Sequence, residues 1–294
     1  MSESDNWTVG RLLTWTTDYL KQHDSDSPRL DAEVLLADAR GCQRIDLYAA
    51  FDEVADERVR TEFREYVRRR ALGEPVAYLV GYREFYSLSF RVTPDVLIPR
   101  PETEHLVVEV LDRLKEQGSP ETSARVADVG TGSGAIAIAV AKHAPSCTVM
   151  AIDASPKALE VAESNAERHH MADRITLIES DLFNAVPAED QFDVVASNPP
   201  YVSESEWSEL SKTVRDFEPR AALVAGPDGD EIIKRLIPQA AERLRADGWL
   251  LIEVSPMIEE RVRASIAEDG HFRRTEAAKD LSGAIRVVKA QRIG

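Results

Sequence analysis

The tetrapeptide Asn198-Pro199-Pro200-Tyr201 carries residue types suited to holding a planar NH2 group. Neither proline has a backbone N–H, so the segment offers acceptors: the Asn198 side-chain oxygen and the proline carbonyls. An amide or aromatic amine nitrogen shares its lone pair with a π system, so it attacks an electrophile only when its hydrogens are held. Tyr201 adds a ring face that can stack on a planar group. We therefore predict that these four residues are catalytic and bind the substrate, by positioning and electrostatics rather than by acid–base chemistry.

A glycine-rich loop, Asp128-Val129-Gly130-Thr131-Gly132, follows a short apolar run and opens a helical stretch. Its glycines let the backbone turn sharply and approach a ligand closely. The acidic residue in front disfavours a phosphate and attracts a cation. S-adenosylmethionine (SAM) carries a sulfonium and an ammonium group, so the loop predicts a SAM site.

Three further residues extend this predicted site. Asp153 stands 25 residues after Asp128, at the end of the next apolar run, where a carboxylate can accept both ribose hydroxyls. Asp181 and Leu182 follow the third run, where a carboxylate could accept from the adenine amino group and an apolar side chain could pack on the ring.

Strand-like and helical segments alternate from residue 125 onward, which predicts an α/β fold with a mostly parallel sheet covered on both faces. Ligands on such a sheet bind at the carboxyl ends of the strands. The expected strands are Val126–Val129, Thr148–Ile152, Ile175–Ile178, Val194–Ala196, Trp249–Val254, Phe272–Thr275 and Ile285–Lys289.

The chain before this region divides into two parts. Apolar residues at three- and four-residue spacing predict three helices within residues 1–73, the third ending at Gly73. Residues 74–100 have β-type composition, including the run Val96-Leu97-Ile98, and predict a hairpin linker. Residues 101–294 would then form the SAM-binding domain.

The composition narrows the function classes. The formal charge of −16 argues against a protein that grips nucleic acid directly. Two cysteines, 105 residues apart, form neither a disulfide framework nor a zinc site, which indicates a reducing compartment. The acidic start of the chain and the lack of a long apolar run favour a cytoplasmic protein with no membrane partner and no metal. A monomer is expected.

Several motifs together make the chain resemble the bacterial protein-(glutamine-N5) methyltransferases of peptide-chain release factors, the HemK/PrmC family. Besides the loop and the tetrapeptide, they are Pro28–Glu33, Glu74–Gly81, Phe85-Tyr86, Ile98–Glu104, Glu218–Leu223, Gly226–Gly229, and Asp280–Gly283 with Arg286. The resemblance implies a class I SAM-dependent methyltransferase with a Rossmann-like, seven-stranded sheet whose last strand is antiparallel, and a small helical domain that helps hold the substrate. It implies that Asp128 to Gly132, Asp153, Leu182 and Asn198 line SAM. It also implies that residues 198–201 hold the glutamine of the Gly-Gly-Gln loop of class I release factors, which act in translation termination.

Three positions depart from the family pattern. Ser255 and Ile258 stand where glycine and glutamine are usual, and the Leu182 position is often aromatic. Two other readings stay open: an N6-adenine DNA or RNA methyltransferase, whose exocyclic amine poses the same chemical problem, and a SAM-binding protein without catalysis.

Overall fold

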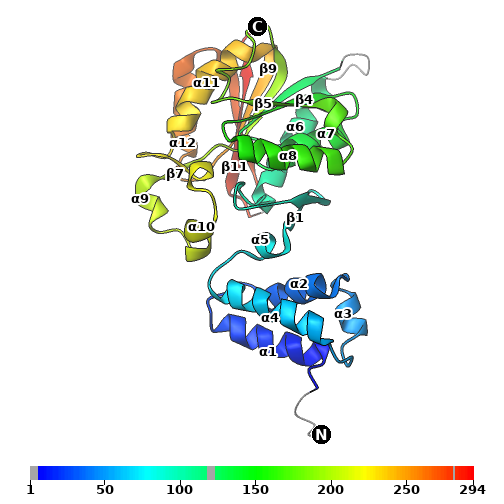
Figure 1. Ribbon diagram of the computed structural model, residues 1–294. Helices are drawn as coiled ribbons and strands as arrows, with labels where there is room; N and C mark the ends of the chain where they lie inside the picture. The colour runs from blue at the N-terminus through cyan, green and yellow to red at the C-terminus, as the bar shows by residue number, and fades with distance from the viewer. Residues whose placement is uncertain (1–5, 118–122, 281) are drawn as a thin grey trace. The chain divides into compact units, whose positions relative to one another are not determined.

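The structure is a computed structural model and describes residues 6–117, 123–280 and 282–294 (Figure 1). Residues 1–5 and Leu281, which belong to the acidic start and to the C-terminal motif, lie outside the described part. The chain forms two compact units. One, the helical unit, comprises Met1–Gly81 and Ser211–Phe217, and the other, the sheet unit, comprises Tyr82–Leu210 and Glu218–Gly294. The domain boundaries expected from the sequence stay a prediction.

The helical unit contains an apolar core that includes Leu13, Leu35 and Phe63. Its helices are α1 (Val9–Lys21), α2 (Pro28–Arg40), α3 (Asp46–Ala49), α4 (Glu57–Ala71), α5 (Val76–Val80) and α10 (Lys212–Phe217). Side chains cap the first turns of α1 and α4, because the Thr8 side chain accepts from the Arg11 N–H and the Asp56 side chain from the Val59 N–H. The three expected helices are confirmed as α1, α2 and α4.

A β-hairpin opens the sheet unit. Strands β1 (Tyr82–Phe85) and β2 (Leu88–Arg91) pair antiparallel across Tyr86 and Ser87, which have φ of +50° and +59°. Two successive positive φ angles are typical of the turn that best matches the strand twist. The run 96–98 is not a strand, contrary to expectation, because Pro94 and Pro99 on either side limit ladder hydrogen bonding.

The main sheet has seven strands in the order β10-β11-β9-β6-β3-β4-β5, and only β11 runs against the others. The strands are β3 (Arg125–Val129), β4 (Thr148–Asp153), β5 (Ile175–Glu179), β6 (Phe192–Ser197), β9 (Leu244–Glu253), β10 (Phe272–Lys279) and β11 (Ile285–Arg292). Every expected strand is confirmed, as are the seven-stranded α/β fold and its antiparallel last strand.

Helices cover both faces of this sheet (Figure 1). Alternate residues of β6 show the two faces: Val194 and Ala196 pack with one set of helices, Val195 with the other. The first set is α6 (Glu104–Gln117), α7 (Ala135–His143) and α8 (Pro156–Arg168), and the second is α11 (Glu231–Arg243) and α12 (Glu259–Asp269). Within the described ranges, no helix has the length and apolar character needed to span a membrane.

The strand order reverses between β3 and β6. From β3 the chain moves outward through β4 and β5, then returns to place β6 on the other side of β3. Loops that leave neighbouring strands in opposite directions open a crevice at their carboxyl ends. A short parallel pair, β7 (Val202–Ser203) and β8 (Val224–Gly226), and the helix α9 (Glu204–Trp207) follow this crevice in the chain.

Candidate functional site

A cavity of about 330 Å³ lies at the carboxyl ends of β3, β4 and β6, within the sheet unit. That volume falls in the range of small-molecule sites. It brings together eight residues singled out from the sequence: Val129, Gly130, Asp153, Asp181, Leu182, Asn198, Pro199 and Pro200. The predicted residues that do not line it are Asp128, Thr131, Gly132 and Tyr201.

The loop after β3 is held by backbone bonds to β4. The N–H groups of Gly130 and Thr131 both donate to the Ile152 carbonyl, at 2.8 and 2.9 Å. Gly130 and Gly132 have φ of +77° and +55°, and a Cβ would meet no atom closer than 3.9 Å at the first and none within 4 Å at the second. Glycine is therefore needed here for its backbone conformation rather than for space.

Asp128 lies beneath this loop and is fully buried. One carboxylate oxygen accepts from the Thr131 hydroxyl at 2.6 Å and from the Ala137 N–H at 3.1 Å, so it ties the loop to the start of α7. Burial raises the pKa of Asp128 to about 7, although both hydrogen bonds favour the charged form. In this geometry Asp128 shapes the loop from below and does not face the cavity.

Asp153 ends β4 and does face the cavity. One of its oxygens accepts from the Gly132 N–H at 2.8 Å and the other from the Ser155 N–H at 2.9 Å. Burial raises the pKa of this carboxyl, while the backbone bonds act in the opposite direction. Each oxygen has a second lone pair, so a fixed carboxylate remains able to accept from a ligand hydroxyl.

Leu182 and Asp181 reach the cavity from the loop after β5. Leu182 has a φ of +53°, a conformation that costs a residue with a Cβ about 1–2 kcal/mol. Such strain is found where the surrounding structure needs a side chain at one place. The Asp181 side chain is paired with Arg235 of α11, so a ligand would share this carboxylate with a guanidinium.

The tetrapeptide follows β6 and contributes its first three residues to the cavity. The Ser197 hydroxyl donates to the Val129 carbonyl at 2.7 Å, which fixes the end of β6 against β3. The Asn198 amide nitrogen donates to the Thr103 hydroxyl oxygen at 3.0 Å. The Tyr201 ring packs instead against the core beneath α11 and α12, and burial raises its pKa to about 12.

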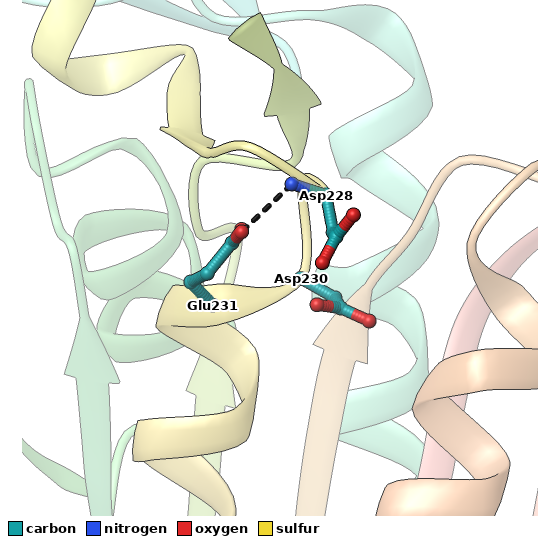
Figure 2. A group of neighbouring side chains, drawn as sticks. All are labelled: Asp228, Asp230 and Glu231. Carbon is teal, nitrogen blue, oxygen red and sulfur yellow. Dashed lines mark hydrogen bonds between the residues drawn. The ribbon is translucent and has the colours of Figure 1, made fainter.

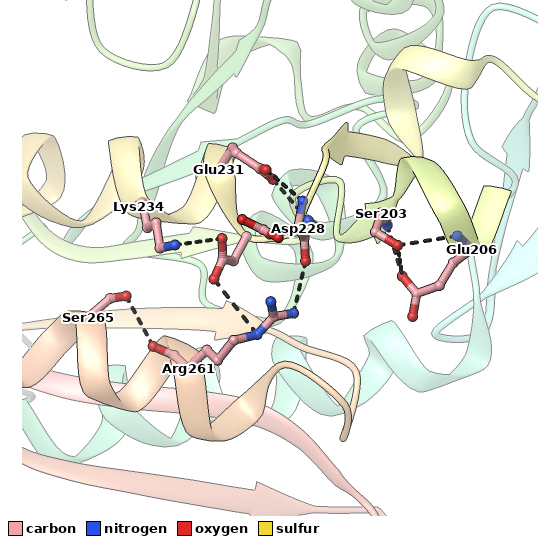
Figure 3. Close-up of polar contacts among 9 residues, drawn as sticks. Ser203, Glu206, Asp228, Glu231, Lys234, Arg261 and Ser265 are labelled. Carbon is pink, nitrogen blue, oxygen red and sulfur yellow. Dashed lines mark hydrogen bonds and ion pairs between the residues drawn. The ribbon is translucent and has the colours of Figure 1, made fainter.

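The chain after the tetrapeptide is fixed by a capping box. The Ser203 N–H donates to the Glu206 carboxylate at 2.9 Å, and the Glu206 N–H donates to the Ser203 hydroxyl at 3.2 Å (Figure 3). The Val202 N–H also donates to the Leu223 carbonyl at 2.9 Å, which joins β7 to β8. These bonds hold the segment that leaves Tyr201.

Three neighbouring carboxylates, those of Asp228, Asp230 and Glu231, lie in the acidic loop Asp228-Gly229-Asp230-Glu231 (Figure 2). Glu231 accepts from the N–H groups of Asp228 and Gly229, and Asp230 pairs with Lys234 at 2.9 Å and Arg261 at 3.8 Å (Figure 3). The carboxylates of Glu231 and Asp230 thus already have donors or cations of the chain as partners. We interpret the cluster as a structural support for the loop rather than as a metal site.

The acidic loop packs against the end of the tetrapeptide. Gly229 has a φ of +84°, and a Cβ on it would lie 2.7 Å from the Tyr201 carbonyl oxygen and 3.1 Å from the Ser203 nitrogen. The loop backbone therefore packs directly on the chain at the end of the tetrapeptide, at a distance that only glycine allows.

Sequence reasoning missed several residues that line the cavity. They are Asp95, Leu97, Ala154, Ser155, Ala158, Ser180, Ser197, Pro219, Ala221, Ala222 and Ile232. Neighbours of predicted site residues, such as Ala154 and Ser180, could have been expected from their place after strands. Residues from 95–97 and 219–222 come from loops that carry no ligand signal of their own. Ile258, which departs from the family pattern, is 1% exposed and packs in the core.

Comparisons with known proteins agree with this architecture. The model of the PrmC N-terminal domain family matches residues 11–81, and the model of the methyltransferase small domain family matches residues 105–218. Among solved structures, a methyltransferase from Pyrococcus furiosus has a TM-score of 0.50 at 16% identity, covering 77% of this chain and 98% of its own. The 16S rRNA methyltransferase of T. thermophilus has a TM-score of 0.51 at 19% identity, covering 72% of this chain and 49% of its own. These two show the fold alone.

Curated relatives match over nearly the whole chain. A release factor glutamine methyltransferase of Rhodopirellula baltica is 53% identical, covering 99% of this chain and 100% of its own length. One from Geobacter sulfurreducens is 40% identical over 96% of both chains. With the sheet, the cavity and the tetrapeptide in place, this similarity shows that the chain is an enzyme that belongs to the release factor glutamine methyltransferase family, whose cofactor is S-adenosylmethionine.

Proposed function

We propose that this enzyme transfers the methyl group of SAM to the side-chain amide nitrogen of the glutamine in the Gly-Gly-Gln loop of class I release factors. One observation carries the proposal: Asn198, Pro199 and Pro200 line the same cavity as Asp153 and Leu182. An acceptor-rich segment for an NH2 group thus shares one space with a fixed carboxylate and an apolar side chain.

The cavity fits SAM by the chemistry of its lining. Asp153 is held by two backbone N–H groups with lone pairs left for ribose hydroxyls, and Leu182 is fixed as an apolar surface for the adenine ring. Val129 and Gly130 would lie along the methionine part, Asp181 near the adenine amino group, and Asp128, Thr131 and Gly132 would shape the loop. When bound, SAM supplies an electrophilic methyl group on a sulfonium.

The residues of this chain then act on the glutamine. The Asn198 side-chain oxygen and a proline carbonyl accept hydrogen bonds from the two N–H groups of the glutamine amide. This orients the lone pair of the amide nitrogen toward the methyl group. These acceptors also stabilise the positive charge that grows on the nitrogen as the N–C bond forms and the S–C bond breaks. One N–H proton then leaves to water, and no histidine is needed. Tyr201 supports the segment from the core side.

We infer that the helical unit contributes to the docking of the release factor, as expected for residues 1–73. A cavity of about 490 Å³ lies between α1 and α4, and its walls include Trp7, Trp15, Tyr19, Phe63 and Arg64. Trp15 is 50% exposed, although tryptophan side chains are on average highly buried. Aromatic and arginine side chains together are typical of residues that anchor protein partners.

The test is mass spectrometry of tryptic peptides after incubation with SAM. A folded class I release factor should gain one methyl group on the glutamine of its Gly-Gly-Gln loop, and a variant with alanine at that glutamine should gain none. Free glutamine should react poorly, because remote binding energy is needed to hold the amide. Methyl on adenine of DNA or RNA would support the N6-adenine alternative, and no transfer to any substrate would favour a non-catalytic SAM-binding protein.

A further inference from the structure

The nitrogen end of the Asn198 amide is already occupied in the structure. Asn198 Nδ2 donates to Thr103 Oγ1 at 3.0 Å, and Thr103 is 5% exposed. Thr103 ends a short 3-10 helix, Pro101–Thr103, and does not line the cavity, whereas Asn198 does. An amide has one donor end and one acceptor end, so fixing its nitrogen also fixes where its oxygen points.

Thr103 accepts from Asn198 only if its own hydroxyl proton is directed elsewhere. The Thr103 hydroxyl acts on the carboxyl of Glu253, at the end of β9: it lowers the pKa of this carboxyl, which burial raises to about 7. A hydroxyl that lowers the pKa of a carboxyl donates to its ionised form, so with Glu253 ionised the Thr103 O–H is directed at Glu253 and a lone pair is left for Asn198. The three side chains therefore form a directed series, Asn198 to Thr103 to Glu253.

Glu253 is almost completely buried. It is 2% exposed, and its Oε2 has no hydrogen-bond partner among the described residues. The charged groups that act on it are Glu102, Arg286 and Arg100. Arg100 is itself anchored by Glu218, which also accepts from the Ile98 N–H at 3.2 Å. An almost buried carboxyl of this kind needs a reason to be there, since its desolvation costs free energy that an apolar side chain would avoid.

The consequence concerns the substrate. The NH2 group of an amide only donates hydrogen bonds, so it binds the oxygen of Asn198 and is repelled by its nitrogen. A flipped Asn198 would set two donors against each other at the reacting nitrogen. Either orientation has nearly the same shape, so packing alone does not choose between them.

We propose that Thr103, anchored by Glu253, is a positioning residue that fixes the orientation of the Asn198 amide so that its oxygen faces the substrate nitrogen. The proposal rests on the function proposed above. It gives a role to Thr103 and Glu253, neither of which touches the cavity. It also explains why a hydroxyl group is buried at the start of α6.

The first test compares Thr103→Val, which keeps the shape and loses the hydroxyl, with Thr103→Ser, which keeps the hydroxyl. For Thr103→Val, kcat on the release factor should fall about 10- to 100-fold, because a half-buried donor loses its acceptor and the amide is free to flip. The dissociation constant for SAM should stay within about two-fold. Thr103→Ser should keep kcat within about three-fold of the wild type. Thr176→Val, on the exposed side of β5, is the matched control.

The second test is a double-mutant cycle with Asn198→Ala. If Thr103 acts only through Asn198, then Thr103→Val should cost nothing further once Asn198 is alanine. A merely structural role would instead lower kcat by the same factor in both backgrounds. Thermal unfolding of each variant shows whether the fold is intact.

Three results would overturn the proposal: wild-type kcat in Thr103→Val, a Thr103→Ser variant as slow as Thr103→Val, or losses that multiply in the double mutant. A wild-type protein that fails to methylate the release factor would instead contradict the proposed function. The two failures are therefore distinguishable.

Discussion

The Gly132 N–H donates to Asp153 Oδ2 at 2.8 Å, so the loop after β3 is fastened to the end of β4 by a side chain that also faces the cavity. The bond joins the two halves of the expected SAM site. Asp153 thus both lines the cavity and holds the loop, and removing it should affect the cavity and the loop together.

Asp153→Ala should weaken SAM binding by roughly 2–4 kcal/mol, since hydrogen bonds to a charged acceptor are lost. Calorimetry with SAM alone measures this. Asp181→Ala is the comparison, and its effect should be smaller because Arg235 already pairs with that exposed carboxylate. An unchanged SAM affinity in Asp153→Ala would mean that the residue only shapes the turn.

Asn198→Ala should lower turnover by about 10²–10³-fold, judged from the loss of one positioned group in other enzymes. The binding of SAM should be largely retained, because Asp153 and the loop are untouched. Asn184→Ala, an exposed asparagine outside the cavity, serves as the control. A variant that keeps more than a third of the wild-type rate would contradict the assigned role.

Gly229→Ala should slow methyl transfer, because its Cβ would press on the Tyr201 carbonyl oxygen from 2.7 Å. Gly270→Ala isolates the effect of backbone strain, since Gly270 has a similar φ of +77° and nothing within 4 Å of the added Cβ. Both variants should lose some stability, measured by urea unfolding. Only Gly229→Ala should lose activity, and equal activity in the two would mean that Tyr201 tolerates displacement.

The raised pKa of Asp128 predicts how the stability of the protein depends on pH. Burial raises its pKa to about 7 from the ordinary aspartate value of 3.8, so between these pH values the folded state binds more protons than the unfolded state. The free energy of unfolding contributed by this group therefore falls as pH rises through that window, and is constant above it.

Asp128→Asn keeps an oxygen for Thr131 and Ala137 and removes the ionisation. The stability of the variant relative to the wild type should accordingly rise between about pH 4 and 7, measured by urea unfolding at several pH values. A difference in the free energy of unfolding between variant and wild type that does not change with pH would contradict the raised pKa of Asp128.

The helical unit provides a further prediction. Trp15→Ala and Arg64→Glu should each raise KM for the release factor several-fold and leave the SAM dissociation constant unchanged, because truncating an interface anchor commonly costs about 1–2 kcal/mol. Arg58→Glu, on the same helix but outside the α1–α4 cavity, is the charge control. Equal KM values for Arg64→Glu and the wild type would remove this cavity from the docking surface.

Much of the architecture could be predicted from local pattern. The buried strands β3, β4 and β6 each contain a short apolar run, and glycine, aspartate or asparagine stands at or just after their carboxyl ends, so their type and their cavity-lining ends are both visible in the sequence. The run 96–98 has the same composition but lies between two prolines, and proline chemistry outweighed β propensity there.

The direction of individual side chains could not be predicted in the same way. Asp128 and Asp153 each end or nearly end a strand, yet one turns down onto α7 and the other faces the cavity. Tyr201 faces the core, and Thr103 bonds to a residue 95 positions away. Such contacts depend on how distant segments meet, which spacing along one segment does not encode.

The helical unit is formed by two separate segments of the chain, and this affects how the two units can be separated by truncation. The unit includes Ser211–Phe217, so the chain enters it twice, and no single peptide-bond cleavage yields two intact pieces. Gly73 packs against the Phe217 ring, since a Cβ built on Gly73 would lie 3.5 Å from a ring carbon. Removing residues 1–81 would therefore uncover this ring. A stable isolated sheet unit therefore requires a second excision, with residues 211–217 replaced by a short glycine–serine bridge.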